Sequence, residues 1–264
     1  MPFAENQGTK IYWDDQGQGQ PVLLIMGLGW ASNMWHRTRP VLTSRYRTIA
    51  FDNRGAGRSD VPPGPYSMAL MASDAAAVLD AAGIDSAHLV GASMGGMIAQ
   101  EFALQYPGRV RSLILACSAP GGPHAVQAEP EAIQLLFRQV ATPRERAEAA
   151  VPFIYDASTP RKLVEQDLTT LSELYPSPQG YMAQLQGILA WEAYSRLPQI
   201  SVPTLVIHGA NDRLIPAANA DLIASRIPGS KLVKIPQASH IFMTDQPTAA
   251  HQAMLEFLAA HATP

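Results

Sequence analysis

The sequence predicts an α/β fold built on a mostly parallel sheet with helices on both faces. Two observations support this prediction. Short apolar runs of strand length alternate along the chain with longer helical patterns, and several of these runs are apolar at every position, as expected of strands covered on both sides. The chain has 264 residues, of which 47% are hydrophobic and 16% charged, which is enough for one sizeable core and one insertion.

The first part of the chain contains three runs of strand character before the first long helix. Residues 9–15 alternate between polar and apolar side chains, which predicts an edge strand. Residues 22–26 are apolar throughout, and residues 46–51 follow as a second buried strand. Residues 67–82 are rich in alanine and amphipathic, and Gly83 ends the helix that they predict.

The alternation continues in the middle of the chain and returns at its end. Residues 87–105 predict a strand, a sharp turn and a helix, and a further strand follows at 111–117. The last part of the chain predicts two strands, a helix between them and a terminal helix, in the order 203–207, 216–226, 231–235 and 247–260.

The stretch 120–198 breaks this alternation. Proline and glycine at its start are followed by helical patterns with no clear strand between them. Three apolar stripes at helical spacing stand out: Leu135, Leu136, Phe137 and Val140; Leu163, Val164, Leu168 and Leu171; and Met182, Leu185, Leu189 and Trp191. We expect residues 1–119 and 199–264 to form the core and residues 120–198 to form an all-helical cap over the edge of the sheet. The alternative is a set of extra helices packed on one flank of the core.

The turn between strand and helix presents Ser93. A residue at such a turn is held in a strained backbone conformation, which is usually retained only at functional sites. Gly91 and Gly95 flank it in a Gly-x-Ser-x-Gly arrangement, as expected where any side chain would collide with the adjoining strand or helix. The start of the helix also directs N–H groups toward an anion that forms beside Ser93. We therefore predict that Ser93 is a nucleophile.

A serine hydroxyl needs a base to take its proton and a group to orient that base. In parallel sheets such residues stand at the carboxyl ends of strands. Asp212 lies just past the strand that ends at Ile207, and His240 lies just past the strand that ends at Ile235. The chain order Ser93, Asp212, His240 matches one known solution to this geometry.

Each of these assignments has a rival. His208 ends a strand close to Asp212 and is the alternative base, although its place next to Gly209 favours a core histidine. Asp245 follows His240 too closely to orient it from the far side, and Asp221 falls in the middle of a helix. Four further histidines are expected to be solvated, in loops or in the terminal helix: His36, His124, His251 and His261.

Acyl transfer also needs two N–H groups directed at the developing negative oxygen. We predict that the backbone N–H of Met94, directly after the nucleophile, is one of them. The second is assigned to Leu28, in the glycine-rich loop after the strand at 22–26. The alternative interpretation of Gly27 and Gly29 is a plain tight turn.

Taken together, the elbow from Gly91 to Gly95, the string Asp52-Asn53-Arg54-Gly55-Ala56-Gly57-Arg58-Ser59, Asp212 and His240 resemble the α/β-hydrolase fold superfamily. The resemblance covers almost the whole chain except the insertion, whose place corresponds to the family's cap. It implies an eight-stranded sheet, and within the superfamily the chain is similar to small carboxylesterases and enol-lactonases. It also implies that the string beginning at Asp52 is a structural loop, with Arg54 in internal hydrogen bonds. One departure is Met26-Gly27, where members of this fold often have His-Gly.

A serine at position 93, in place of an aspartate, argues against haloalkane dehalogenation and epoxide opening by this fold's usual route. It favours acyl transfer to water through an acyl-Ser93 intermediate. The predicted pocket is mainly apolar, and its candidates beside Leu28 and Met94 are Gly27, Trp30, Met34, Met97, Trp191, Tyr194, Ile241 and Met243. We expect a small, mainly apolar ester or lactone as substrate. The alternatives are carbon–carbon bond hydrolysis, cofactor-free perhydrolysis and a non-catalytic sensor of a small ligand.

Charge and composition exclude other classes of partner. Nineteen Lys and Arg against 22 Asp and Glu give a net charge of −3, and no basic block is present, so we expect neither nucleic acid nor a membrane as partner. Cys117 is the single cysteine, and the polar N-terminus lacks the apolar core of a signal peptide, so we expect a cytoplasmic protein. We expect no cofactor and no metal. The sequence carries no signal of oligomeric state.

Overall fold

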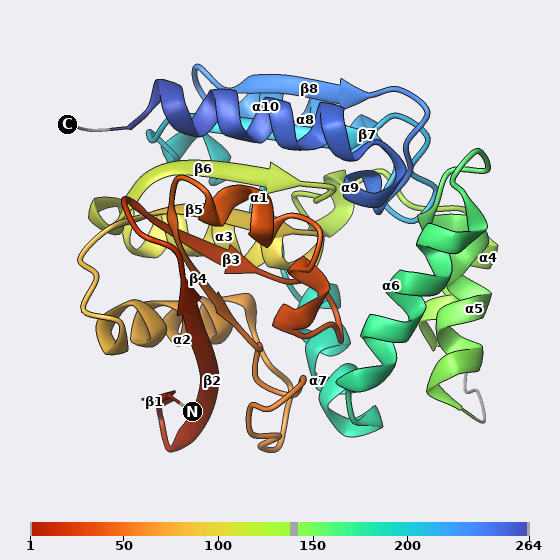
Figure 1. The fold of residues 1–264 in the computed structure, drawn as a ribbon, viewed down its shortest axis with the longest axis horizontal. Coiled ribbons are helices and arrows are strands. Elements are labelled where there is room, and N and C mark those ends of the chain that lie inside the picture. Colours follow the sequence, from red (N-terminus) through yellow and green to blue (C-terminus); the bar gives the residue numbers. More distant parts are fainter. Residues whose placement is uncertain (1, 138–141, 263–264) are drawn as a thin grey trace.

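In the computed structural model, residues 2–137 and 142–262 are described, and an eight-stranded sheet forms their centre (Figure 1). The strand order is β1-β2-β4-β3-β5-β6-β7-β8. All neighbours from β4 to β8 pair in parallel, whereas β1 and β2 are antiparallel additions at one edge. The strands are β1 (Phe3–Asn6), β2 (Thr9–Gln16), β3 (Pro21–Ile25), β4 (Arg47–Phe51), β5 (Ala87–Ala92), β6 (Val110–Ala116), β7 (Thr204–Gly209) and β8 (Lys231–Ile235). The predicted fold class is confirmed.

The outermost strand differs from the prediction. β2 is not the edge, because β1 pairs outside it with Phe3 opposite Tyr12. β1 has only four residues, two apolar and two polar, so it carries too little periodicity to be recognised.

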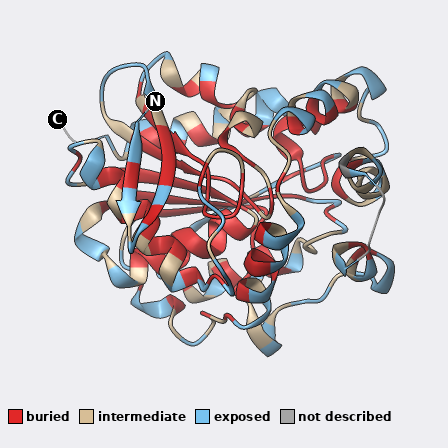
Figure 2. Cartoon of the chain, turned by 90° about the horizontal axis from the view of Figure 1, so that it is seen from below, coloured by how far each residue is buried: buried red, intermediate tan, exposed pale blue. Residues whose placement is uncertain are grey.

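Helices cover both faces of the sheet because the side chains of each strand alternate between them. In β3, Leu23 and Ile25 pack with α2 (Met68–Ala81), α3 (Met94–Gln105) and α8 (Ala218–Arg226) on one face. Val22 and Leu24 pack on the other face, with α1 (Arg39–Thr43) and α10 (Pro247–Ala260). Figure 2 shows the strands as the most continuously buried part of the chain.

Four helices occupy the segment between β6 and β7: α4 (Pro130–Phe137), α5 (Pro143–Ile154), α6 (Arg161–Glu173) and α7 (Pro178–Leu189). Figure 1 shows α4, α5 and α6 side by side, beyond the carboxyl ends of the strands. A separate apolar cluster joins α5 and α6 to Ile241 of the core segment. No helix within the described residues is long and apolar enough to span a lipid bilayer.

The three predicted stripes have different outcomes. The second lies on α6, where Val164, Leu168 and Leu171 are buried. The first lies on α4 in part, since Val140 is outside the described residues. The third is confirmed in part: Leu185 and Trp191 are buried, whereas Met182 and Leu189 are 40% and 62% exposed. α7 also buries three small residues, Gly180, Ala183 and Gly187.

Candidate active site

Ser93 stands between β5 and α3 in the conformation that the sequence predicts. Its φ of 57° and ψ of −121° are strained for a residue with a side chain. A Cβ atom at Gly91 would lie 2.2 Å from the carbonyl oxygen of Gly95, and one at Gly95 would lie 2.0 Å from that of Ile25. Neither position can therefore hold a side chain, so the steric argument from the sequence is confirmed. The backbone N–H of Ser93 donates to Ala116 at 2.9 Å and fixes the turn against β6.

Asp212 and His240 meet at the ends of β7 and β8. The Nδ1 of His240 lies 2.7 Å from Oδ2 of Asp212, and Oδ1 of Asp212 accepts the N–H groups of Leu214 and Ile215 at 2.9 and 2.8 Å. Burial on its own would raise the pKa of Asp212, but the charge of His240 and hydrogen bonds from His208 and His240 lower it to about 2. The ionised carboxylate can only accept, so Nδ1 of His240 carries a proton, and Nε2 is the ring nitrogen left for proton transfer.

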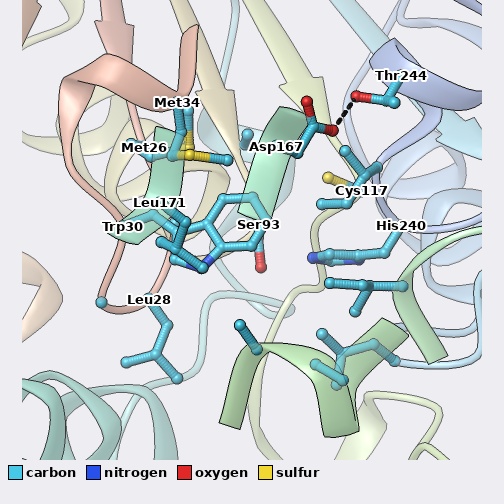
Figure 3. A pocket seen from close by; sticks show the side chains of 18 of the residues that line it. Met26, Leu28, Trp30, Met34, Ser93, Cys117, Asp167, Leu171, His240 and Thr244 are labelled. Atoms are coloured by element: carbon cyan, nitrogen blue, oxygen red, sulfur yellow. Dashed lines mark hydrogen bonds between the residues drawn. The ribbon is translucent and has the colours of Figure 1, made fainter. Parts of the chain in front are cut away.

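Ser93 and His240 line one pocket, and Figure 3 shows their side chains facing the same space, with Trp30 and Leu28 along one side of it. The Ser93 hydroxyl makes no hydrogen bond to another described residue and is accessible from the pocket. In unliganded enzymes the bond between nucleophile and base is often long and shortens only with substrate bound. The arrangement can therefore support proton transfer from Ser93 to His240.

The rival residues occupy other roles. Nε2 of His208 lies 2.8 Å from the carbonyl oxygen of Ile215, an acceptor, so this nitrogen carries the proton and also contacts Asp212 at 3.0 Å. His208 is fully buried and does not line the pocket. Asp245 accepts the N–H of Ser239 at 2.7 Å and so holds the loop before His240. Asp221 pairs with Lys234 at the surface.

Two of the histidines expected in solvent are half-buried against residues that lie far away along the chain. The Nε2 of His36 lies 3.0 Å from Asp167, and that of His251 lies 3.2 Å from the hydroxyl of Thr38. Both rings are only partly exposed. Sequence reasoning missed these contacts because the partners lie far away along the chain.

The glycine-rich loop after β3 lies against the nucleophile. A Cβ atom at Gly27 would be 3.0 Å from that of Ser93. The loop is held from both sides, because Asn53 donates to the carbonyl of Met26 at 2.8 Å and Gly29 donates to Oε1 of Gln184 at 2.7 Å. These bonds fix the loop although Met26 replaces the histidine often found there.

The N–H groups at the two predicted oxyanion positions have no protein acceptor among the described residues. They belong to Leu28, between the two anchored positions of the loop, and to Met94, at the first position of α3. The N–H of Trp30 turns back to Gly27 at 3.3 Å, so it is occupied. The two predicted oxyanion donors are therefore free to bind an anion, and their role stays a prediction.

Gln184 is a residue that sequence reasoning missed. It is fully buried on α7, and its Nε2 donates to the carbonyl of Arg54 at 2.8 Å while its Oε1 accepts Gly29. The helix can come this close because Gly180 and Gly187 have no side chain. A Cβ atom at Gly180 would lie 2.0 Å from the oxygen of Gly55, and one at Gly187 would lie 1.7 Å from that of Tyr66. The sequence signal for this close contact is the set of small residues at helical spacing on either side of Gln184. The same loop confirms the internal bonds expected of Arg54, whose Nε donates to Asp74 at 2.6 Å.

The pocket lies between the strand ends and the insertion helices. Of the predicted lining residues, the structure places five in it: Gly27, Trp30, Met34, Ile241 and Met243. Leu28 lines it as well, whereas the side chain of Met94 is buried in the core and does not. The opposite wall, which the sequence did not predict as such, comes from the insertion and includes Leu135, Leu136, Arg146, Ala147, Ala150, Ile154, Tyr155, Asp167, Leu168, Leu171, Tyr175 and Tyr181.

Three predicted lining residues are corrected. Met97 lies one turn along α3 and packs into the core between the sheet and its helices. Trp191 donates its indole N–H to Glu101 at 2.8 Å, behind the pocket. Tyr194 stacks on His124 with ring centroids 4.2 Å apart. The chain after α7 turns away from the strand ends to enter β7, so its aromatic residues cannot reach Ser93.

A buried carboxylate joins the insertion to the core at the pocket wall. Asp167 of α6 accepts from Thr244 at 2.6 Å (Figure 3) and from Tyr155 at 3.1 Å, and it lies 2.8 Å from the guanidinium of Arg37. Burial raises the pKa of Asp167, but the contacts with His36, Thr244 and Arg37 outweigh it and hold the pKa below its usual range. Asp167 is therefore ionised and neutralises Arg37.

Comparison with known proteins agrees with this geometry. The sequence signature of the alpha/beta hydrolase fold matches residues 20–247. The protein named "Putative carbamate hydrolase RutD" of Azorhizobium caulinodans is 31% identical over 264 residues, covering 97% of this chain and 98% of that protein. The 2-hydroxy-6-oxo-6-phenylhexa-2,4-dienoate hydrolase of Burkholderia cepacia is 32% identical over 268 residues, covering 95% and 91%. A thermophilic esterase from Thermogutta terrifontis superposes with a TM-score of 0.86 at 30% identity, covering 99% of both chains. The chain therefore belongs to the α/β-hydrolase fold family and is a hydrolase.

Proposed function

We propose that this protein is a serine hydrolase that cleaves a small, mainly apolar carboxylic ester or lactone. The observation that carries the proposal is an accessible serine on a strained elbow, in the same pocket as an imidazole whose Nδ1 is fixed 2.7 Å from an ionised carboxylate. Strain of this kind costs roughly 1–3 kcal/mol and persists where the surrounding structure enforces it, typically at functional sites.

The reaction proceeds in two acyl transfers. Ser93 Oγ attacks the substrate carbonyl while Nε2 of His240 takes the hydroxyl proton, and Asp212 stabilises the imidazolium that forms. The N–H groups of Leu28 and Met94 bind the oxyanion. His240 then protonates the leaving alcohol as the carbonyl–oxygen bond breaks, which leaves an acyl-Ser93 ester. Water, deprotonated by His240, attacks this ester and releases the acid.

The apolar lining of the pocket supports an apolar substrate body, and the similarity to a solved esterase supports an ester carbonyl. A lactone is a cyclic ester and needs the same steps. The relative named as a carbamate hydrolase makes a carbamate carbonyl a related target for the same attack.

A second candidate is carbon–carbon bond hydrolysis, favoured by the 32% identity to the dienoate hydrolase. In that reaction Ser93 or an activated water would attack a ketone carbonyl, and the leaving group would be a stabilised carbanion rather than an alcohol. The position of His240 fits both reactions, because each requires a proton to be moved at the attacked carbonyl.

A fluorophosphonate probe and a substrate panel distinguish these functions. We expect the probe to label Ser93, as read by peptide mass spectrometry, and 4-nitrophenyl acetate and butyrate to be hydrolysed. The panel should include γ-lactones, an aryl carbamate and a vinylogous 1,5-diketone. Ser93→Ala should abolish turnover without unfolding the protein.

Each alternative has its own outcome. Labelling of Ser93 with cleavage of the diketone alone would favour the carbon–carbon hydrolase. Labelling of Ser93 with turnover of the carbamate alone would show that the substrate is a carbamate rather than an ester or lactone. Absence of both labelling and turnover would refute the enzymatic proposal and favour a sensor of small ligands.

A further inference from the structure

We propose that Arg146 forms an anion-binding subsite in the wall of the pocket, and that the natural substrate carries a carboxylate on the part that lies under the insertion helices. The inference rests on the proposed function and narrows its substrate class to a mainly apolar ester or lactone with one anionic end.

Arg146 stands on α5 and lines the same pocket as Ser93. Its guanidinium lies over the ring of Tyr181, 4.8 Å from the ring centroid, and Tyr175 lines the pocket beside it. Burial raises the pKa of both phenols, and the charge and hydrogen bonding of Arg146 act against that rise in each. The guanidinium is thus held between two tyrosines rather than extended into solvent.

Arg146 has no charge partner in the part of the chain that the structure describes. None of the ion pairs of residues 2–137 and 142–262 includes it, and its Nη1 is buried without a hydrogen-bond partner there. Arg146 is half-buried as a residue, but its Nη1 has lost water without gaining an acceptor, which is unfavourable for a charged group unless a ligand supplies one. The ring of Tyr181 compensates for only part of that loss.

The other basic groups of the pocket do not share this property. His36 and Arg37 both lie within 3.0 Å of Asp167, whose ionised carboxylate neutralises Arg37. Arg146 is therefore the one uncompensated cation among the described lining residues. A carboxylate is the natural complement, because its two oxygens match the parallel N–H groups of a guanidinium.

Arg144 provides a matched comparison on the same helix. It lies two positions earlier and pairs with Glu148 and Glu165 at 2.6 Å each, at the surface. The same residue type is thus neutralised by side chains of this chain when it faces outward, and is left for a ligand when it faces the pocket.

The test compares anionic and neutral substrates on matched variants. On the acyl side, the 4-nitrophenyl hemiesters of adipic, pimelic and suberic acids are paired with 4-nitrophenyl hexanoate, heptanoate and octanoate. On the alcohol side, 4-acetoxybenzoate is paired with its methyl ester. We expect Arg146→Met to lower the ratio of kcat/KM for the anionic over the neutral member by about 10- to 100-fold in at least one series, the range for a hydrogen bond to a charged group.

The control variants sharpen this result. Arg144→Met should leave the ratio unchanged, and Arg146→Lys should restore part of it. Binding of the same anionic and neutral esters to Ser93→Ala, measured by calorimetry with and without Arg146→Met, reports the subsite without catalysis. Equal ratios in wild type and Arg146→Met, together with no loss of anion binding in the Ser93→Ala background, would overturn the inference. A wild type that neither turns over esters nor reacts with the fluorophosphonate would refute the proposed function instead, and the binding measurement would still decide on Arg146.

Discussion

Gln184 allows a direct test of how the insertion positions the loop beside Ser93. Gln184→Met keeps the length of the side chain and removes both of its polar atoms. The N–H of Gly29 and the carbonyl of Arg54 would then lose partners at 2.7 and 2.8 Å. A buried polar group left unpaired costs about 1–3 kcal/mol, so two such groups should lower the free energy of unfolding by about 2–6 kcal/mol.

The kinetic effect should fall on kcat. Gly29 is the anchor next to Leu28, whose N–H we assign to the oxyanion hole, and loss of a whole donor lowers kcat by about 100- to 1000-fold. We expect a smaller loss, about 10- to 100-fold, because Asn53 still holds the carbonyl of Met26 at the other end of the loop. KM should change little, since Gln184 does not line the pocket.

The assay is hydrolysis of 4-nitrophenyl butyrate and of the matching thionoester. Sulfur accepts N–H hydrogen bonds weakly, so the thionoester gains little from an oxyanion hole. A displaced donor therefore lowers the ratio of ester to thionoester turnover, whereas a loss of folded protein lowers both rates alike. Leu185→Ala controls for lost packing of the same helix, and Gln186→Met controls at an exposed position. The reasoning is refuted if Gln184→Met keeps the wild-type ratio, or if Leu185→Ala lowers it equally.

Three further changes test other parts of the structure. The pKa of Asp212 is about 2 in the folded protein, below its unfolded value of 3.8, so its carboxylate stabilises the fold above about pH 4 by roughly 2 kcal/mol. That contribution is lost as the pH falls through 4 toward 2, so urea unfolding should show the advantage of wild type over Asp212→Asn shrinking in this window; a constant difference would contradict the assignment. Gly95→Ala would place a Cβ atom 2.0 Å from the oxygen of Ile25, so its melting temperature should fall sharply, while Gly108→Ala, with nothing within 4 Å, should melt like wild type. Asp167→Ala should lower the free energy of unfolding by about 3–5 kcal/mol, because it leaves buried partners uncompensated; denaturant unfolding within error of wild type would show that this junction contributes no stability.

The residues at the strand ends could be placed from the sequence because local rules fix them. Ser93 is defined by the glycines on either side, which the backbone contacts require. Asp212 and His240 each follow a buried strand, and parallel pairing of β7 with β8 brings those ends together. Such features need no knowledge of distant contacts, so the sheet and these three positions were predictable.

The wall contributed by the insertion could not be predicted in the same way. Large apolar residues at helical spacing predicted the buried face of α7, but of these Met182 and Leu189 face solvent and Leu185 is buried. The buried face also contains Gly180, Ala183 and Gly187, and at the two glycines the lack of a side chain allows backbone to touch backbone. Gln184 was overlooked for a related reason, since a glutamine in the middle of a helix is usually solvated and only its distant partners show otherwise.

The insertion therefore has two separable physical roles. Asp167 and Gln184 attach it to the core through buried polar contacts whose partners lie next to the site, at positions 37 and 29. The apolar side chains of α5 and α6 that face the pocket make no such bonds, so their replacement alters the shape of the wall without releasing the loop beside Ser93. Arg146 is not apolar but shares this property, because its guanidinium holds no core residue in place. A change at Arg146 should consequently alter which substrate is chosen, whereas a change at Gln184 should alter how fast any substrate reacts.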